Sequence, residues 1–420
     1  MKILVVGSGA REDAICQALQ KSDRYNDVFC APGNAGMRLF GVQTVGIDEL
    51  EFTKLADFAI ENDITYTIVG PEKPLVEGIV DYFQSRGLKI FGPNKAAAQI
   101  EGSKTFTKRL MSEAGVATAF YQEFTDFGLA IEYIEKKNQF PIVIKANGLA
   151  SGKGVFIIET LDNAINILHQ LLNDHRFGTD KVIVEEYLEG EEFSLMAFVH
   201  DENFYPMPIA QDYKRVLDGD KGLNTGGMGA ICPLDNIDCD IVYQAYKDIL
   251  KPFVKQMHRE GVSYTGVLYA GLILTPNGVK VIEFNVRFGD PETEVVLPRL
   301  KSDLSKVIAN LLNGEDVDNI SWRDDGVDLG VFVASNGYPV KPEIGKSIGP
   351  KEQFTNTQLN LNFASVAENS HGLVTDGGRL YLVHTHANTL QNAQDKIYSY
   401  LDSVDTTNVF YRKDIGRNAI

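Results

Sequence analysis

The sequence predicts a multidomain chain that combines α/β and α+β architecture, and three observations carry this prediction. The chain has 420 residues, which is too long for one ordinary hydrophobic core. Over the first hundred residues, short apolar runs alternate with amphipathic runs, as in a parallel sheet covered by helices. Between about 118 and 195, and again after 328, helix-like and strand-like runs form compact α+β units.

The N-terminal region, 1–102, is predicted to be a parallel-sheet α/β domain. Its strands lie in KILVVG, DVFCAPGN, DITYTIVGPE and LKIFGPN, and a helix follows the first of them in AREDAICQALQ. Each strand runs into Gly or Pro, which is typical of a strand end. Because the loops of a parallel sheet collect at the carboxyl ends of its strands, we expect these loops to lie together.

The second unit, 103–327, begins with a helix in which Phe106, Leu110 and Ala114 follow helical spacing. A compact lobe is predicted at about 118–195, from helices in DFGLAIEYIEKK and TLDNAINILHQLL and strands in FPIVIK, GVFIIE and DKVIVEEYL. The polar stretch QDYKRVLDGDKGLNTGGMGA follows, and it is long for a connection without structure of its own. Long loops of this kind are more often functional than idle.

The rest of the chain supplies a helix near 241–260, two strands in GVLYAGLILT and VKVIEFNVR, and a tail. The tail, 328–420, contains strands in DLGVFVASNG and RLYLVHTHA and a helix in LQNAQDKIYSYLDSV. These segments predict a small C-terminal α+β domain.

Composition narrows the class of protein. Apolar residues make up 44% and charged residues 23%, which is ordinary for a soluble globular protein, and the net charge of −17 argues against nucleic acid or an anionic membrane as partner. The apolar start ends at Gly7, and no apolar run approaches the roughly 20 residues of a membrane helix, so we expect a cytoplasmic protein. The cysteines form no C-x-x-C pair and are expected to be buried, inert thiols.

The stretch KANGLASGKGV, 145–155, resembles a P-loop at first sight. A P-loop needs four residues between its glycines and Ser or Thr after the lysine, but three residues separate Gly148 from Gly152, and Gly154 follows Lys153. The stretch joins two predicted strands. Two interpretations remain, a plain hairpin turn and a loop that covers phosphate groups.

The turn GSGARE is a second candidate for phosphate binding. A dinucleotide fingerprint would need glycine at position 12, where Glu12 stands, so a hydride-transfer enzyme is disfavoured. The turn from Gly7 to Ala10 could present backbone N–H groups and a helix N-terminus to an anion, with Arg11 close by. The alternative is a strand-to-helix turn in which glycine serves steric needs alone.

The segment VKVIEFNVRFGDPE carries the residues most suited to catalysis. Strand alternation places Glu283, Asn285 and Arg287 on one face, which is either a solvated face or a magnesium site with a cation beside it. Arg287 could stabilise charge on a transferring phosphoryl group. The turn Gly289-Asp290-Pro291 brings the chain back against the same place.

Further candidates surround these segments. Lys104, Lys145 and Lys153 are candidate phosphate contacts, and Lys145 is the strongest because it ends an apolar strand at the mouth of the glycine loop. In VIVEEYLEGEEF, main-chain groups at Glu186 and Leu188 offer an edge for an adenine, and Glu192 could accept from ribose hydroxyls. The alternative for this acidic cluster is a solvated face.

Taken together, these pieces resemble the ATP-grasp superfamily, in which two α+β lobes clamp ATP and a glycine-rich loop closes over its phosphates. The ordered set GPEKPLVEGIVD, GPNKAAAQIEGSK, KANGLASGKGV, QDYKRVLDGDKGLNTGGMGA and IEFNVRFGDPE narrows the likeness. It resembles the phosphoribosylamine–glycine ligase (glycinamide ribonucleotide synthetase) family of purine synthesis. The resemblance spans nearly the whole chain, and RFGDPE and NTGGMG in this order are its most specific parts.

The resemblance implies roles for individual residues. The catalytic residues would be Arg287 and Lys145, and the metal ligands would be Glu283 and Asn285. The ATP contacts would be Lys104, Lys145, Gly148, Ser151, Gly152, Lys153, Gly154, Glu185, Glu186, Tyr187, Leu188 and Glu192. The residues that face the other substrates would be Gly9, Asp212, Lys214, Arg287, Gly289, Asp290 and Pro291.

The implied reaction is phosphorylation of glycine by ATP, followed by attack of the amine of 5-phosphoribosylamine on the acyl phosphate. The implied cofactors are ATP as co-substrate and Mg²⁺, with Mn²⁺ as an alternative, and transient contact with the amidotransferase that makes phosphoribosylamine is a further implied partnership. The domains would be a substrate-side domain, 1–102, an ATP-grasp core, 103–327, with its mobile lobe at about 118–195, and a C-terminal domain, 328–420.

Several positions depart from the family pattern. Ala10 and Asp13 stand where glycine and histidine are usual, Asn147 and Ser151 replace aspartate and alanine, and Tyr213 replaces a histidine. The two missing histidines affect the expected substrate side. Two rival functions remain: another ATP-grasp ligase that joins a carboxylate to an amine, and a nucleotide-binding regulator without catalysis.

Overall fold

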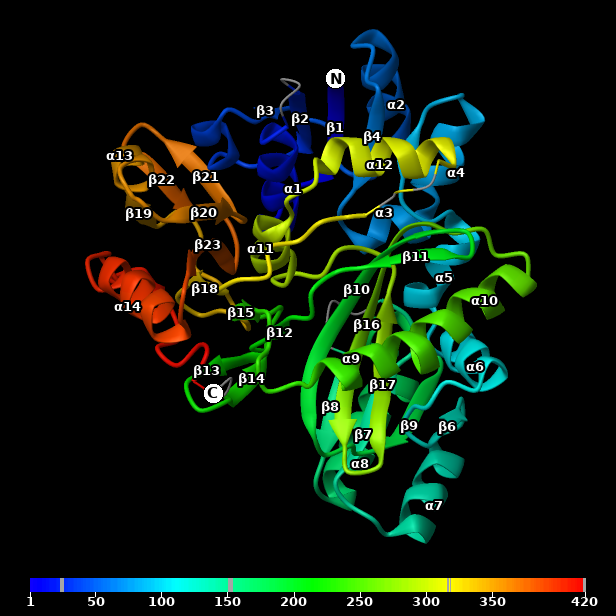
Figure 1. Ribbon diagram of the computed structural model, residues 1–420. Coiled ribbons are helices and arrows are strands. Elements are labelled where there is room, and N and C mark those ends of the chain that lie inside the picture. Colours follow the sequence, from blue (N-terminus) through cyan, green and yellow to red (C-terminus); the bar gives the residue numbers. More distant parts are fainter. Residues whose placement is uncertain (23–25, 150–153, 316, 318, 418–420) are drawn as a thin grey trace.

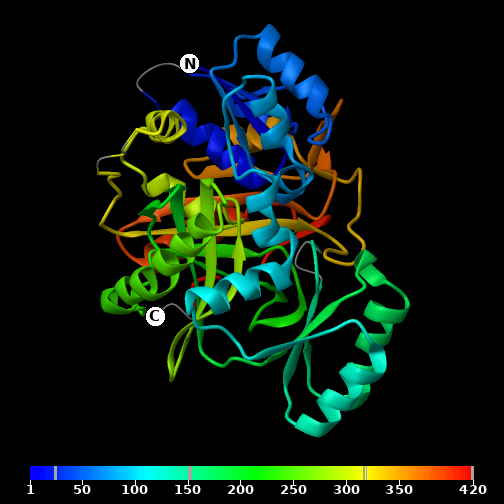
Figure 2. The same cartoon turned by 90° about the vertical axis from the view of Figure 1, so that its right-hand side faces the viewer.

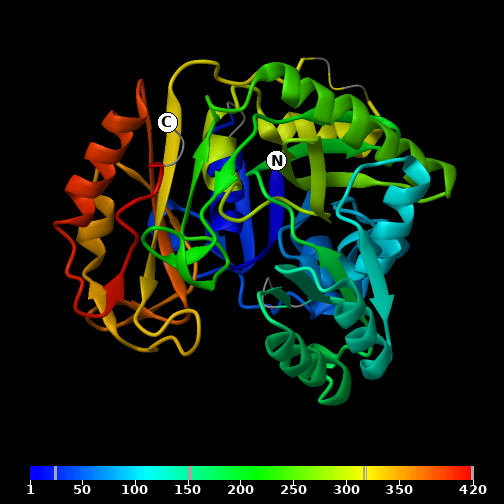
Figure 3. The ribbon, with the colours of Figure 1, turned by 90° about the horizontal axis from the view of Figure 1, so that it is seen from below.

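The computed structural model describes residues 1–22, 26–149, 154–315, 317 and 319–417. The N-terminal parallel sheet lies at the top of Figure 1, the green and cyan lobes lie below it, and the C-terminal elements lie beside both. Seen from below in Figure 3, helix α14 (Leu390–Leu401) and the lobe with helix α7 (Phe127–Lys137) lie on opposite sides of the molecule. No helix in the described part of the chain is long and apolar enough to cross a membrane.

The N-terminal sheet is parallel, with strand order β3-β2-β1-β4-β5, which confirms the predicted α/β class. The central strand β1 is apolar and buried throughout Ile3–Val6, as expected for a strand covered on both faces. Its elements are β1 Lys2–Gly7, α1 Ala10–Gln20, β2 Asp27–Pro32, η1 Met37–Phe40, β3 Gln43–Thr44, α2 Phe52–Glu61, β4 Tyr66–Val69, α3 Glu72–Glu77, α4 Ile79–Ser85, β5 Ile90–Phe91 and α5 Lys95–Gly102.

The lobe that Figure 2 shows projecting from the rest of the molecule is an antiparallel sheet in the order β6-β9-β7-β8 with helices packed on it. Its helices begin at side-chain caps, because Asp126 accepts from the Leu129 N–H and Thr160 from the Asn163 N–H. Its own apolar cluster includes Ile144. The elements are β6 Tyr121–Phe124, α7 Phe127–Lys137, β7 Ile142–Ala146, β8 Val155–Ile158, α8 Leu161–Leu168, η2 His169–Asn173, η3 Arg176–Gly178 and β9 Val182–Glu186.

A second antiparallel sheet, β11-β10-β16-β17, forms the floor between this lobe and the N-terminal sheet. Helix α10 packs on it through Phe253, which stacks on Phe284 with ring centroids 4.0 Å apart. The helices and strands of this part of the chain, some of which pack elsewhere, are α6 Lys104–Ala114, β10 Glu191–His200, β11 Asn203–Pro206, α9 Cys239–Ala245, η4 Tyr246–Leu250, α10 Lys251–Arg259, β16 Thr265–Thr275, β17 Gly278–Asn285, α11 Thr293–Val296, η5 Leu297–Arg299 and α12 Leu304–Asn313.

The C-terminal sheet runs β12-β15-β18-β23-β20, with β24 paired to β18. The polar stretch 211–230, which the sequence indicated to be a long loop, contains β12 and the first residues of β15, so this sheet joins strands from before residue 328 to strands after it. Its elements are β12 Gln211–Asp212, β13 Arg215–Leu217, β14 Lys221–Asn224, β15 Gly229–Cys232, β18 Val327–Ser335, β19 Ser347–Gly349, α13 Lys351–Thr355, β20 Asn360–Phe363, β21 Val366–Asn369, β22 Gly372–Thr375, β23 Arg379–Ala387, α14 Leu390–Leu401 and β24 Val409–Phe410.

Candidate active site

A cleft of about 1160 Å³ opens where the lobe, the floor sheet, the N-terminal sheet and the C-terminal strands meet. Most of the predicted site residues line it, although they come from distant parts of the chain. The lining includes Gly9, Lys104, Lys145, Gly148, Gly154, Glu185, Glu186, Tyr187, Leu188, Glu192, Asp212, Lys214, Glu283, Asn285, Arg287 and Asp290. Gly289 and Pro291 are not part of that lining, and Ser151, Gly152 and Lys153 lie outside the described residues.

The buried carboxylate of Glu185 holds two lysines in the cleft. Its oxygens lie 2.8 Å from Lys145 Nζ and 2.9 Å from Lys108 Nζ. Burial alone would raise the pKa of Glu185, but the two ammonium groups outweigh burial and lower it. Lys145 also donates to the Ile282 carbonyl at 3.1 Å, which ties the lobe to the floor sheet. Sequence reasoning missed Lys108, although it lies one helical turn after Lys104 in α6.

Helix α6 also holds the first part of the glycine loop. Lys104 Nζ donates to the Gly148 carbonyl at 2.9 Å, and the Thr105 N–H donates to Asn147 Oδ1 at 3.3 Å. Burial lowers the pKa of Lys104, and the nearby Glu283 opposes this shift. The strands β7 and β8 on either side of the loop pair as an antiparallel hairpin. Asn147, one of the departures from the family pattern, therefore anchors the loop to α6.

Glu283 and Asn285 lie at the end of β17, and Asn285 Nδ2 donates to Glu283 Oε1 at 3.4 Å. Both residues face the cleft. The pairing of β17 with β16 shifts register between Gly271 and Leu272. Among the described residues, Glu283 has no ion-pair partner, so its charge is available to a cation. A carboxylate oxygen and an amide oxygen on one strand fit a divalent metal whose other ligands come from phosphate and water.

Arg287 lies beyond the end of β17 and is already paired. Its guanidinium lies 2.9 Å from Glu101 Oε1 and 3.5 Å from Glu72 Oε2. Burial alone would lower the pKa of Arg287, but the two carboxylates raise it. Sequence reasoning placed Arg287 beside the metal pair and missed both partners, which come from α3 and α5 of the N-terminal region.

On the opposite side of the cleft, Lys214 joins two residues that were predicted to have different roles. Lys214 Nζ lies 2.7 Å from Asp212 Oδ1 and 2.9 Å from Glu192 Oε2. Burial opposes the charge, but Asp212 and Glu192 raise the pKa of Lys214 well above its usual value. The expected ribose contact and the expected substrate contacts are therefore one connected group.

The main chain of Glu186 is partly engaged. Its N–H donates to the Phe120 carbonyl at 3.0 Å, and its side chain accepts from Lys280 at 3.0 Å. The Glu186 N–H is thus engaged within the lobe, and the adenine edge at main-chain groups of Glu186 and Leu188 stays a prediction. Tyr187 and Leu188 follow the strand and line the cleft.

The turn after β1 holds an anion that belongs to the chain itself. Glu12 accepts from the Gly9 N–H at 2.6 Å through one oxygen and from Arg11 Nε at 2.6 Å through the other. Arg11 is buried, and its Nη1 donates to the Phe288 carbonyl at 3.3 Å. The carboxylate of Glu12 thus accepts from the Gly9 N–H in this structure, and binding of a phosphate by the turn stays a prediction.

The turn at Asp290 is tied to the C-terminal sheet. Arg379 Nη2 lies 2.7 Å from Asp290 Oδ2, and Nη1 donates to the Gly227 carbonyl at 3.2 Å. The guanidinium also lies 4.5 Å from the centroid of Phe332. Arg379 lines the cleft, and sequence reasoning did not find it because RLYLVHTHA carries no motif for it.

Two of the family departures, Ala10 and Asp13, do not line the cleft. Asp13 is fully buried, accepts from the Phe363 N–H at 2.6 Å and from Gln17 at 3.2 Å, and Ala10 packs against Phe332. For Asp13, where a histidine is usual, the expected link to substrate contacts is therefore weakened. Tyr213 does line the cleft, buried beneath the Arg412 guanidinium 5.3 Å from its ring.

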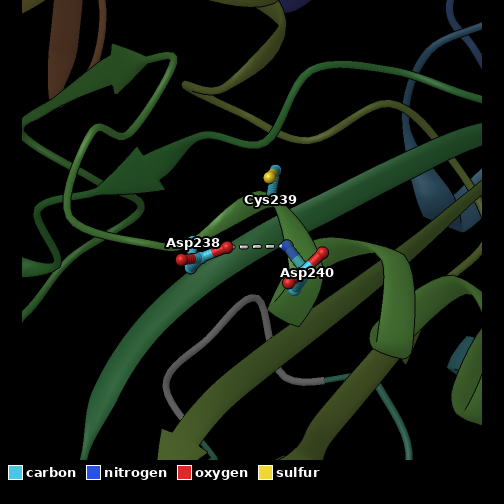
Figure 4. Close-up of side chains that lie close together, drawn as sticks. All are labelled: Asp238, Cys239 and Asp240. Atoms are coloured by element: carbon cyan, nitrogen blue, oxygen red, sulfur yellow. Dashed lines mark hydrogen bonds between the residues drawn. The ribbon is translucent and has the colours of Figure 1, made fainter.

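The cysteines were expected to be buried, which is wrong for Cys239, the first residue of α9. Cys16, Cys30 and Cys232 are buried thiols as predicted, and all four are free. Figure 4 shows that Cys239 lies between two aspartates, of which Asp238 accepts from the Asp240 N–H at 2.8 Å. This exposed trio is thus explained by the helix cap.

Comparison with known proteins agrees with this geometry. Three models of the phosphoribosylglycinamide synthetase family match the chain: the N domain at 1–101, the ATP-grasp (A) domain at 102–293 and the C domain at 328–418. The chain is 50% identical to the phosphoribosylamine–glycine ligase of Streptococcus pneumoniae (strain ATCC BAA-255 / R6) and 48% identical to that of Lactococcus lactis subsp. lactis, with 100% of each chain covered.

Among solved structures, the chain resembles the phosphoribosylamine–glycine ligase of Thermotoga maritima, with a TM-score of 0.85, 31% identity and 99% and 100% of the two chains covered. It also shares its fold with biotin carboxylase from Campylobacter jejuni, at a TM-score of 0.74, 14% identity and 98% and 93% coverage. The fold and the cleft define an ATP-grasp enzyme, a ligase that uses ATP. More narrowly, the chain belongs to the phosphoribosylglycinamide synthetase family.

Proposed function

We propose that this protein joins glycine to 5-phosphoribosylamine at the expense of ATP, giving glycinamide ribonucleotide, ADP and phosphate in purine (IMP) biosynthesis. The observation that carries the proposal is the single cleft in which the Glu185 lysine pair, the Glu283–Asn285 pair and the Asp212–Lys214 pair meet. The family match and the full-length relatives support the same reaction.

In the proposed reaction, glycine's carboxylate oxygen attacks the γ-phosphorus of ATP, ADP leaves, and a glycyl phosphate forms. The amine of 5-phosphoribosylamine then attacks the acyl carbon, phosphate leaves, and the nitrogen loses a proton. The protein itself forms no covalent bond in this reaction, so the rate depends on how it positions the substrates and neutralises the phosphate charge. Lys104, which donates to the Gly148 carbonyl, and Lys145, at the start of the glycine loop, are proposed to contact the phosphates, and Gly148 and Gly154 to lie beside them.

A divalent metal, Mg²⁺ or alternatively Mn²⁺, fits the oxygens of Glu283 and Asn285. When bound there, it neutralises phosphate charge as ATP transfers its phosphoryl group. Arg287, held by Glu101 and Glu72, is proposed to face the phosphoryl group from the N-terminal side. Because both partners fix the guanidinium before substrate binds, its orientation costs little at the moment of reaction.

The remaining proposals concern organisation and partners. We propose a substrate-side domain, 1–102, an ATP-grasp core, 103–327, with a mobile lobe at about 118–195, and a C-terminal domain, 328–420. Gly9, Asp212, Lys214, Gly289, Asp290 and Pro291 are proposed to serve the substrate side. We also propose that the protein is cytoplasmic. Because phosphoribosylamine is labile, we propose that the protein makes transient contact with the amidotransferase that produces it.

The test is ADP release by the purified protein with ATP and Mg²⁺, with glycine and freshly generated phosphoribosylamine added separately and then together. We expect full ADP release, in step with an amide product, when both substrates are present. ATP binding without stimulation by the pair would refute the proposed substrates and would favour another carboxylate and amine. Repeating the assay with Mn²⁺ decides which metal supports the faster reaction.

A further inference from the structure

The cleft contains a buried carboxyl group whose partners differ from those of its neighbours. Glu292 is 2% exposed, lines the cleft and stands directly before α11. The other buried carboxylates of the lining each have a cation beside them: Glu12 has Arg11 at 2.6 Å, Glu101 has Arg287 at 2.9 Å and Glu185 has Lys145 at 2.8 Å. Within the described part of the chain, Glu292 has no such ion pair.

Two hydroxyl groups contact Glu292 instead. Ser194 Oγ lies 2.7 Å and Tyr269 OH 2.8 Å from Glu292 Oε1, and the two hydroxyl oxygens lie 2.8 Å from each other. Three oxygen–oxygen contacts at hydrogen-bond distance need three protons, and two hydroxyls supply two. The group is therefore one donor short when Glu292 is ionised. Protonation of Glu292 would supply the third proton, whereas an ionised Glu292 is a buried carboxylate without a counter-charge, which is costly and suits a partner that brings a positive charge.

The charged groups that face Glu292 are Asp212, Lys214 and Arg287, with Tyr269 in contact. Burial and the nearby Asp212 raise the pKa of Glu292, and Lys214 opposes them. The surroundings of Glu292 in the cleft therefore oppose its charged form. An arriving ammonium group would reverse this balance, because it supplies the missing positive charge.

Glu292 and the proposed metal ligand Glu283 both lie near the ring of Tyr269. A Cβ added to Gly271 would lie 3.4 Å from Glu283 Cγ and 3.5 Å from Tyr269 Cε1. A Cβ added to Gly289 would lie 3.0 Å from Tyr269 Cε2 and 2.6 Å from Glu292 Oε2. Glu283 and Glu292 thus flank opposite edges of one aromatic ring. Gly289, although not part of the cleft lining, leaves the space that the carboxyl of Glu292 occupies.

We propose that Glu292, oriented by Ser194 and Tyr269, binds the ammonium group of glycine while glycine's carboxylate faces the phosphates of ATP, beside the metal pair Glu283 and Asn285. This inference rests on the proposed function, because it assigns one substrate of that reaction to one part of the cleft. Glycine carries its ammonium group and its carboxylate on one carbon, so a single small ligand would present both charges to this part of the cleft. Glu292 selects for the charge of the ammonium group, which a neutral hydroxyl of the same size lacks.

The experiment compares Glu292→Gln with a matched control, Glu294→Gln. Glu294 lies two residues further along, in α11, is fully buried and does not line the cleft. Initial rates of ADP release are measured at saturating ATP and phosphoribosylamine. The inhibition constant of glycolate, which replaces the ammonium group by a hydroxyl, is measured beside the KM for glycine.

We expect Glu292→Gln to raise the KM for glycine by roughly 10- to 100-fold, the size of a lost charged hydrogen bond, with the KM for ATP within about twofold. The preference for glycine over glycolate should fall by a similar factor, and Glu294→Gln should change neither value. Ser194→Ala, which keeps the carboxyl and removes one orienting hydroxyl, should raise the KM for glycine by about three- to tenfold.

An unchanged preference for glycine over glycolate in both Glu292→Gln and Ser194→Ala would overturn the assignment, and so would an equal rise in the KM for glycine and for ATP. If Glu292→Gln does not fold, Ser194→Ala decides alone. Failure of the proposed function gives a different result, because the wild-type protein would then release no glycine-dependent ADP.

Discussion

The carboxylate of Asp13 accepts a hydrogen bond from the backbone N–H of Phe363 at 2.6 Å, across 350 residues of sequence. This bond joins helix α1 of the N-terminal region to strand β20 of the C-terminal sheet, and the side chain of Asp13 is completely buried. Burial raises the pKa of Asp13 to about 7, and the Phe363 N–H and Gln17 oppose that rise. The contact between the two sheets is therefore sensitive to pH.

The first prediction concerns Asp13→Asn. Because the folded-state pKa of Asp13 lies above its unfolded value, the folded protein binds the extra proton, and stability is lost as pH rises toward about 7. The free energy of unfolding of Asp13→Asn minus that of wild type should therefore grow between about pH 4 and pH 7 and level off above about pH 8. The full effect is on the order of 4 kcal/mol. Urea denaturation at each pH measures it, and a difference independent of pH would contradict the burial argument.

The second prediction concerns Glu185. Replacing it with Gln leaves two lysines, Lys108 and Lys145, without their shared counter-charge in a buried place. We expect a loss of about 3 kcal/mol or more in the free energy of unfolding, because an unpaired buried charge is costly. Denaturant unfolding provides the measurement. The exposed pair Arg109–Glu113 offers the control, since Glu113→Gln should leave the midpoint unchanged.

The third prediction concerns the metal ligands. Glu283→Ala should reduce ADP release by at least about 100-fold, while binding of adenine nucleotide in the absence of metal changes little, because the carboxylate faces the phosphates rather than the base. Turnover assays and titration calorimetry separate the two effects. Equal loss of turnover and of metal-free nucleotide binding would rule out the proposed metal role. Removal of metal by EDTA should abolish wild-type turnover reversibly.

The fourth prediction concerns Arg379, which sequence reasoning did not find. Arg379→Met leaves Asp290 without the ion pair that fastens its turn to the C-terminal sheet. We expect a loss of about 3 kcal/mol in the free energy of unfolding. The exposed pair Lys301–Asp324 is the control, and Lys301→Met should not move the unfolding midpoint. Similar midpoints for both variants would show that the Asp290 contact contributes little.

Local sequence patterns were enough to predict most of the elements. The apolar strand in KILVVG, the helix in AREDAICQALQ and the strand pair on either side of the glycine loop formed as expected, because hydrophobic periodicity and glycine positions act within a few residues. The motif RFGDPE pointed to the correct edge of the cleft for Asp290 and Arg287.

The pairing of charged groups depended on the tertiary structure. Sequence spacing could not show that Glu185 holds Lys108 and Lys145, that Glu101 holds Arg287, or that Glu12 occupies the turn before α1. Nor could it show that β15, from before residue 328, shares one sheet with β18.

The sequence by itself therefore determined the fold class, the family and the residue types of the cleft, because these reside in local patterns and ordered motifs. The tertiary structure alone decided which carboxylate faces which cation and left Glu292 with hydroxyls in place of a charge. The physical reason is that ion pairs and buried hydrogen bonds form between segments that only the packing of separate sheets brings within 3 Å or so.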